Sequence, residues 1–259
     1  MTQGGLNILL VEDSDQLAGS ISRELKREYG HTVTWLRDPT LMESTPGNQR
    51  FDVAIIDLLY EHLNREFDAK RLAGRVRVRG DRLLISGLTA IRILREERLA
   101  AGIVVWTSGE ANRRLHLLYS YEDLAIRTYC SKSPGTGRAD ILEQAVRMAH
   151  NHSHYVDPVL NPYLPAGRGR RASDILLQDE CKRAIWRAIA LGADTRIEIQ
   201  RLAGYAARTI GNRIPEMYRD LQEFEAGFVS ARSPLLEVVR FATGNWQFFL
   251  DDAVRVMYP

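Results

Sequence analysis

The feature that most constrains this sequence is a series of short apolar segments that end at or beside polar residues. They lie at 6–11, 32–36, 51–58, 103–107 and 126–130. Such runs are typical of parallel strands buried on both faces of a sheet. After the first segment, Leu17, Ile21 and Leu25 recur with the spacing of one helix face. This alternation predicts a doubly wound α/β domain with a five-stranded parallel sheet.

Polar side chains at the ends of these strands predict a charged site. Glu12 and Asp13 follow the first strand, Asp57 and Thr107 end the third and fourth, and Lys132 follows the fifth. One such residue is commonplace, but parallel strands end at the same edge of a sheet, so the five together favour a functional site. Clustered carboxylates require a cation, and oxygen ligands favour Mg²⁺. Asp57 would then be a nucleophile toward a phosphoryl group, with Lys132 balancing charge on the transferring oxygens.

A family resemblance supports the same interpretation. The chain contains, in this order, ILLVEDSD, DVAIIDLL, VVWTSGE and YCSK. These segments resemble the signature blocks of the receiver domain of bacterial response regulators, which implies a flavodoxin-like fold over residues 1–150. The resemblance implies that Asp57 is the phosphoacceptor and that Thr107 and Tyr129 form a switch pair. It also implies a set of metal ligands, namely Glu12, Asp13, Asp57 and the backbone carbonyl of Leu59.

The sequence departs from the family pattern at two places. Ser133 follows Lys132 where the family usually has proline, and Pro134 comes one position later. The segment GLTAIRILRE resembles the glycine-led helix that normally follows the phosphoacceptor closely, yet its Gly87 lies 30 positions after Asp57. The second departure indicates an insertion at about residues 60–86, which is long for an α/β connection.

Two interpretations of the insertion remain open, a solvated loop or a lid or partner surface over the phosphorylation pocket. The stretch VRVRGDRLLI alternates around Gly80-Asp81, which is typical of a small hairpin. Its arginines suit pairing with the pocket acids, in place of a metal ion. The basic residues of the insertion are Arg65, Lys70, Arg71, Arg75, Arg77, Arg79 and Arg82.

The remainder of the chain predicts a linker and an all-α domain. Residues 151–172 are rich in Pro, Gly and basic side chains, as linkers are, and residues 173–259 have helical apolar spacing. Residues 166–221 hold eleven Lys and Arg against seven Asp and Glu, a modest basic excess of the kind that nucleic-acid binders have.

A second resemblance suggests what the all-α domain does. The stretch ADTRIEIQRLAGYAARTIGNRIPEMYRDL is similar to the helix-turn-helix of LuxR/NarL-type regulators. It implies that a helix from about Ala207 enters the DNA major groove, although a plain three-helix packing module is an alternative. Pro215 predicts a bend in that helix. Beyond Leu221 the chain carries enough apolar residues for an added helix pair or a dimer contact. The implied DNA contacts are Arg208, Thr209, Asn212 and Arg213.

Composition excludes several other classes of protein. No apolar run approaches the length that crosses a bilayer, and the first residues lack the features of a secretory signal. Cys130 and Cys181 are far apart, without metal-binding spacing. We therefore expect a cytoplasmic protein that has no membrane partner.

The leading hypothesis is a DNA-binding transcriptional regulator, not an enzyme, that is switched by phosphorylation at Asp57. It implies Mg²⁺ as cofactor, and double-stranded DNA, a sensor histidine kinase and a second copy of the chain as partners. The alternative is an atypical receiver that a ligand or protein controls without phosphorylation. A third hypothesis is a phosphatase of the haloacid-dehalogenase type, but such enzymes need an Asp two residues after the nucleophile, where this chain has Leu59.

Overall fold

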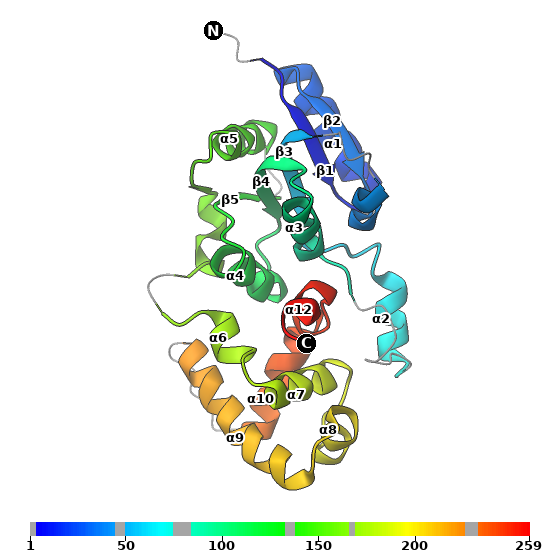
Figure 1. Cartoon of the computed structure of the whole chain (residues 1–259), viewed down its shortest axis with the longest axis vertical. Coiled ribbons are helices and arrows are strands. Elements are labelled where there is room, and N and C mark those ends of the chain that lie inside the picture. The colour runs from blue at the N-terminus through cyan, green and yellow to red at the C-terminus, as the bar shows by residue number, and fades with distance from the viewer. Residues whose placement is uncertain (1–3, 45–49, 75–83, 133–137, 166–168, 226–232) are drawn as a thin grey trace. The chain divides into compact units, whose positions relative to one another are not determined.

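The chain folds into two compact units. The computed structural model describes residues 4–44, 50–74, 84–132, 138–165, 169–225 and 233–259. Residues 1–64 and 85–167 form unit 1, and residues 65–84 and 168–259 form unit 2 (Figure 1). The chain therefore passes from one unit to the other three times, because most of the insertion belongs to unit 2.

Unit 1 is built on a parallel sheet with strand order β2-β1-β3-β4-β5-β6. This confirms the predicted doubly wound α/β fold, with one strand more than expected. The extra strand β6 pairs only two residues with β5, Tyr155 with Thr128 and Val156 with Tyr129, so it is too short to produce a periodic signal. The strands are β1 (Asn7–Val11), β2 (Thr32–Leu36), β3 (Phe51–Asp57), β4 (Ala100–Thr107), β5 (Thr128–Ser131) and β6 (Tyr155–Val156).

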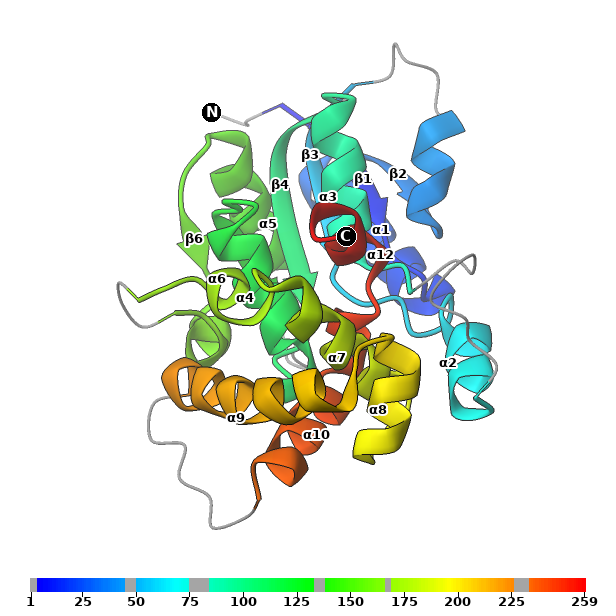
Figure 2. The ribbon, with the colours of Figure 1, turned by 60° about the horizontal axis from the view of Figure 1, so that its bottom comes forward.

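Helices pack against the sheet of unit 1 (Figure 2). Because side chains alternate along a strand, Val53 and Ile55 of β3 join Val104 and Trp106 of β4 in one core cluster with residues of α1 and α5. Helix α3 packs on β3 and β4 with residues outside that cluster. The helices are α1 (Asp15–Tyr29), α3 (Gly87–Glu96), α4 (Arg114–Glu122) and α5 (Arg138–His150), with 3-10 turns at Pro39–Ser44, Ala111–Arg113 and Pro158–Tyr163.

The elements described in unit 2 are helices joined by short loops, in line with the helical spacing of the sequence. Helix α9 continues through Pro215 as a single element, and its residues Ile210, Ile214, Met217 and Leu221 are buried at helical spacing. The helices are α2 (Arg65–Leu72), α6 (Ala172–Leu176), α7 (Glu180–Ala190), α8 (Arg196–Ala203), α9 (Ala207–Phe224), α10 (Pro234–Gly244), α11 (Trp246–Phe249) and α12 (Asp252–Met257).

The last three helices extend the core of unit 2. The Trp186 ring of α7 stacks on Phe249 at a centroid distance of 5.0 Å and meets Phe241 at 5.6 Å. Burial of large aromatic rings is among the strongest contributions to a small core. The apolar residues after Leu221 are therefore used, at least in large part, inside unit 2.

The insertion also packs within unit 2. Phe67 of α2 stacks on Trp246 at 6.4 Å with an interplanar angle of 10°, and the Arg71 guanidinium lies 3.9 Å from the centre of the same ring. At the far end of the insertion, the Leu84 N–H donates to the Leu250 carbonyl (3.1 Å), and the Asp252 N–H donates to the Leu84 carbonyl (2.9 Å). Helix α2 and Leu84 of the insertion thus pack with the C-terminal helices. Residues 75–83, with the expected hairpin and Arg75, Arg77, Arg79 and Arg82, lie outside the described residues.

Among the described residues, no helix has the length and apolar character needed to span a membrane.

Candidate functional sites

Three carboxylates meet at the carboxyl edge of the sheet in unit 1. One oxygen from each of Glu12, Asp13 and Asp57 lies within 4.8 Å of the others, and all three residues are at most 3% exposed. The adjacency of β1 and β3 brings them together, since Val11 pairs with Ile56 just before the acids begin. The convergence expected from the sequence is therefore present.

Local geometry fixes the strand ends that carry these acids. The Glu12 carboxylate accepts the Ser14 N–H (3.0 Å), and Ser14 caps the N-terminus of α1. At the other strand, α3 begins so close to β3 that a Cβ on Gly87 would lie 2.3 Å from the Asp57 carbonyl oxygen. Only glycine fits there, which explains the glycine-led helix although Gly87 lies 30 positions after Asp57.

Lys132 joins the acids from the end of β5. Its ammonium lies 2.6 Å from Glu12 and 2.8 Å from Asp57, and its side chain is 12% exposed. The Lys132 N–H also donates to the Thr107 carbonyl (2.9 Å), which holds the two neighbouring strand ends together. One cation thus bridges two of the three carboxylates.

A second cation, which no sequence pattern singles out, lies against Asp57 and two further acids. Arg113 is 6% exposed, and its guanidinium lies 3.6 Å from Asp57, 2.9 Å from Glu61 and 3.3 Å from Glu110. The 3-10 turn Ala111–Arg113 after β4 places it there. The only signal in the sequence is an arginine shortly after a strand that ends at the site.

The beginning of the insertion also contacts the acids. The N–H groups of His62 and Leu63 donate to the same Asp13 carboxylate oxygen, at 2.6 and 3.1 Å. Asn64 then joins the two ends of the insertion, because its amide donates to the carbonyls of Tyr60 and Ile85 and accepts the Ile85 N–H. Backbone groups at the root of the insertion therefore donate to one carboxylate oxygen of Asp13, a residue that the resemblance assigns to the metal ion.

Two basic residues of the insertion pair with acids of their own helix. Lys70 pairs with Glu66 at 2.7 Å, and Arg71 pairs with Asp68 at 2.9 Å, both within α2. The expectation that an insertion arginine neutralises the acids stays a prediction, because Arg75, Arg77, Arg79 and Arg82 lie outside the described residues. Arg113, which lies outside the insertion, has its guanidinium beside Asp57.

Burial perturbs the titration of Asp57. Desolvation raises the pKa of Asp57 from 3.8 to about 6, with Glu12 acting in the same direction and Lys132 and Arg113 opposing it. Its Oδ1 atom is buried and accepts no hydrogen bond within the described part of the chain. The neighbouring Tyr60 is fully buried, and desolvation together with the Asp57 charge raises the pKa of its phenol well above the usual value.

In unit 2, the residues that the resemblance assigns to DNA differ in their surroundings. Arg208 and Asn212 are exposed on the side of α9 opposite its buried stripe, and Thr209 is partly buried. Arg213 instead pairs with Glu216 at 2.6 Å and with Asp179 at 3.2 Å, and these partners raise the pKa of its guanidinium. Two of the four side chains are thus fully presented to solvent.

Comparisons with known proteins find a likeness of fold that extends over both units. No family model matches the sequence, and no curated protein matches it. Two solved structures match over 91% of this chain and 98% of their own, at 18% identity: two RcsB dimers bound to two parallel DNAs (TM-score 0.52) and the two-component response regulator RcsB-DNA complex (TM-score 0.53). The chain has the two-domain fold of a response regulator. At this identity the likeness is one of fold.

Within the receiver fold, the two implied switch residues are buried. The Thr107 hydroxyl has a 3.5 Å contact to the Ser108 carbonyl, and the Tyr129 hydroxyl lies 3.0 Å from that of Ser120 in α4. Tyr129 also packs against the Tyr121 ring at 6.0 Å. The Tyr129 side chain thus contacts α4, and the Thr107 hydroxyl contacts the residue that follows β4.

The donor set of the receiver fits a hard divalent cation. Three carboxylates converge, and the Asp57 Oδ1 atom is buried without a hydrogen-bond donor among the described residues. Such oxygen-rich sites suit Mg²⁺. Leu59, the source of the implied carbonyl ligand, lies two residues beyond Asp57 and forms an antiparallel bridge with Ser86.

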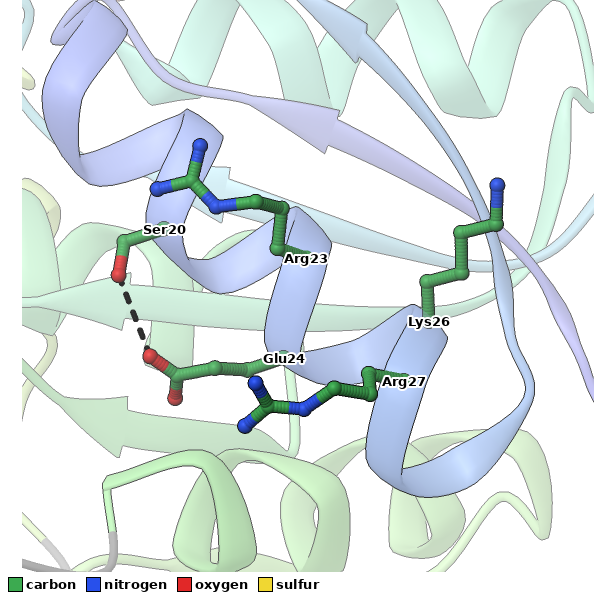
Figure 3. A pocket seen from close by; sticks show the side chains of 5 residues that line it. All are labelled: Ser20, Arg23, Glu24, Lys26 and Arg27. Carbon is green, nitrogen blue, oxygen red and sulfur yellow. Dashed lines mark hydrogen bonds between the residues drawn. The ribbon is translucent and has the colours of Figure 1, made fainter.

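A separate pocket of about 650 Å³ lies along α1 (Figure 3). It is lined by Ser20, Arg23, Glu24, Lys26 and Arg27, and the Ser20 hydroxyl donates to the Glu24 carboxylate at 3.2 Å. All five residues belong to one helix, and none is buried. This is a solvated, mainly basic helix face, and we assign no ligand to it.

Proposed function

We propose that this chain is a DNA-binding response regulator and that phosphorylation of Asp57 switches it. The observation that carries the proposal is the buried cluster of Glu12, Asp13 and Asp57 with the Lys132 ammonium 2.8 Å from Asp57. Phosphoryl transfer needs a positioned nucleophile and positive charge around the transferring oxygens, and little other chemistry from the protein. The two-domain fold agrees with this role.

In the proposed reaction, an Asp57 oxygen attacks phosphorus, an O–P bond forms, and the bond from phosphorus to the donor's leaving group breaks with its electron pair. Mg²⁺ held by Glu12, Asp13, Asp57 and the Leu59 carbonyl would supply charge neutralisation and orientation. Lys132 pairs with a phosphoryl oxygen, and the Thr107 hydroxyl donates to the acyl phosphate. Movement of Thr107 and Tyr129 would then couple the phosphoryl group to the α4 side of the receiver. This is a single regulatory transfer, without catalytic turnover.

Incubation with acetyl phosphate and Mg²⁺ tests this proposal. Intact-mass analysis should detect one added phosphoryl group, and Asp57→Asn should abolish it. Asp52→Asn is the matched control, because it lies in the same strand and accepts the Asn7 N–H, which an amide oxygen also accepts. No uptake by the folded wild-type chain, or uptake retained in Asp57→Asn, would contradict the proposal.

The second candidate is an atypical receiver controlled by a ligand or protein without phosphorylation. The hydrogen bonds from His62 and Leu63 to Asp13 favour it, since they use one carboxylate oxygen of a proposed metal ligand. A folded protein that takes up no phosphate would support this candidate. The same assay therefore separates the two.

For unit 2 we propose that α9 enters the DNA major groove. We also propose that the chain binds as a homodimer, which places two copies of α9 on one duplex. Arg208, Thr209, Asn212 and Arg213 are the proposed contacts, with base readout by Arg and Asn and a phosphate contact by Thr. Affinity should fall steeply as salt concentration rises, since bound basic side chains displace counterions. A sensor histidine kinase is the proposed phosphodonor.

A further inference from the structure

Arg113 is the feature of the pocket that the proposed function does not use. Its side chain is 8% exposed and lies within ion-pair distance of three carboxylates. These come from the end of β3 (Asp57), the root of the insertion (Glu61) and the turn before α4 (Glu110). Burying a guanidinium costs desolvation free energy, which nearby carboxylates offset. The three carboxylates therefore hold Arg113 at this position.

Arg113 places a positive charge beside the carboxylate that a metal ion would bind. Its guanidinium lies 3.6 Å from the Asp57 Oδ1, which is also the buried oxygen that accepts no hydrogen bond within the described residues. With Lys132 on the other Asp57 oxygen, Asp57 already faces two cations. A divalent ion that binds Asp57 would therefore meet a second positive charge at close range.

We propose that Arg113 is a built-in counter-cation that competes with the divalent metal ion for Asp57. The inference rests on the proposed function, since it concerns the metal site that phosphoryl transfer to Asp57 requires. Glu61 and Glu110 hold the guanidinium in this position, and they also give it alternative partners when the ion enters. Arg113 is therefore a positioning residue that sets how readily the pocket accepts its cofactor.

Electrostatics gives the direction of the effect. Like charges a few ångströms apart repel strongly where water is excluded, and screening by salt is weak for buried groups. Arg113→Gln removes this repulsion and keeps a polar side chain that Glu61 and Glu110 can bind. We expect Arg113→Gln to bind Mg²⁺ about tenfold more tightly than the wild type.

Calorimetric titration of the full chain with Mg²⁺ tests the inference without any phosphoryl transfer. Arg27→Gln is the matched control, because it removes the same charge from the last turn of α1, where the side chain is 78% exposed. Its Mg²⁺ affinity should equal that of the wild type. Arg113→Lys, which keeps the charge, should also stay close to the wild type.

The outcomes separate this inference from the proposed function. Tighter Mg²⁺ binding by Arg113→Gln alone supports the inference even if no phosphate is taken up, which would remove only the proposed function. Equal or weaker binding by folded Arg113→Gln overturns the inference, as does the absence of binding in both proteins. If Arg113→Gln does not fold, Arg113→Met keeps a long side chain at this buried position and is titrated in its place, with the same criteria.

Discussion

The acid pocket of unit 1 and the exposed face of α9 in unit 2 were both expected from family-like patterns, but they differ in how far the pattern decides the geometry. At the pocket, Asp57 and Lys132 meet within 2.8 Å, because parallel strands deliver their ends to one edge. On α9, Arg208 is exposed whereas Arg213 is paired with Glu216 and Asp179. The ends of parallel strands lie close together whatever their side chains, whereas each side chain on a helix face can pair with other nearby groups.

The largest expected effect concerns the bridging lysine of the pocket. Lys132→Ala leaves Glu12 and Asp57 buried without their common cation, and we expect a loss of about 3 to 5 kcal/mol in the free energy of unfolding. Urea denaturation followed by circular dichroism measures it.

The matched variant in unit 2 is Lys182→Ala, whose side chain pairs with Asp220 at 2.6 Å with both partners partly exposed. It should cost about 1 kcal/mol, since water can solvate the remaining carboxylate. Equal losses of unfolding free energy in Lys132→Ala and Lys182→Ala would contradict the claim that the ion pairs of the pocket are the more deeply buried.

The pH dependence of stability provides a second test of the pocket. Because the folded pKa of Asp57 is raised from 3.8 to about 6, the folded state keeps a proton that the unfolded chain releases. This contribution is complete below about pH 4 and is lost as pH rises through about 6, which amounts to about 3 kcal/mol. Relative to Asp57→Asn, the wild type should therefore lose stability between pH 4 and 7. Parallel pH profiles would argue against a buried, desolvated Asp57.

The α9 face predicts unequal effects on DNA binding. Arg208→Ala should weaken binding by about 1 to 3 kcal/mol if the side chain reads a base. Arg213→Ala should cost less, because Arg213 must first leave two carboxylates to reach DNA. Fluorescence anisotropy with duplexes selected from a random library by the full chain compares them. A larger effect at Arg213 would show that its ion pairs break on binding.

A smaller effect than at the acid pocket is expected at the contact between the insertion and the C-terminal helices. Trp246→Ala removes the ring that Phe67 and Arg71 cover, and should cost about 1 to 2 kcal/mol. Trypsin should then cleave faster after Lys70 and Arg71. Met257→Ala, at a side chain that is 56% exposed, is the control and should leave both unchanged.

The same reasoning explains which residues of the pocket can be predicted from the sequence. The positions of Glu12, Asp13, Asp57 and Lys132 follow from the strand ends, so the place of the pocket in the fold is predictable from the sequence. The position of Arg113 is not, because its reach depends on the 3-10 turn after β4, which has no periodic pattern.

The packing of the insertion was equally beyond prediction. Helix α2 has no buried residue, so its amphipathic signal is weak, and only the i, i+4 pair of Phe67 and Arg71 marks the side that meets Trp246. The partner ring lies 175 or more positions later in the chain. Contacts between distant segments of this kind are set by tertiary packing, which local spacing does not record.

The central claim is that occupancy of the Asp57 pocket controls DNA binding by unit 2. It is tested most directly by measuring the affinity of the full chain for a selected duplex with and without Mg²⁺ and beryllofluoride, a phosphoryl mimic. We predict a change in affinity of at least about tenfold, or 1.4 kcal/mol, that is absent in Asp57→Asn. The same affinity with and without beryllofluoride, under conditions where its binding to Asp57 is verified, would contradict the account.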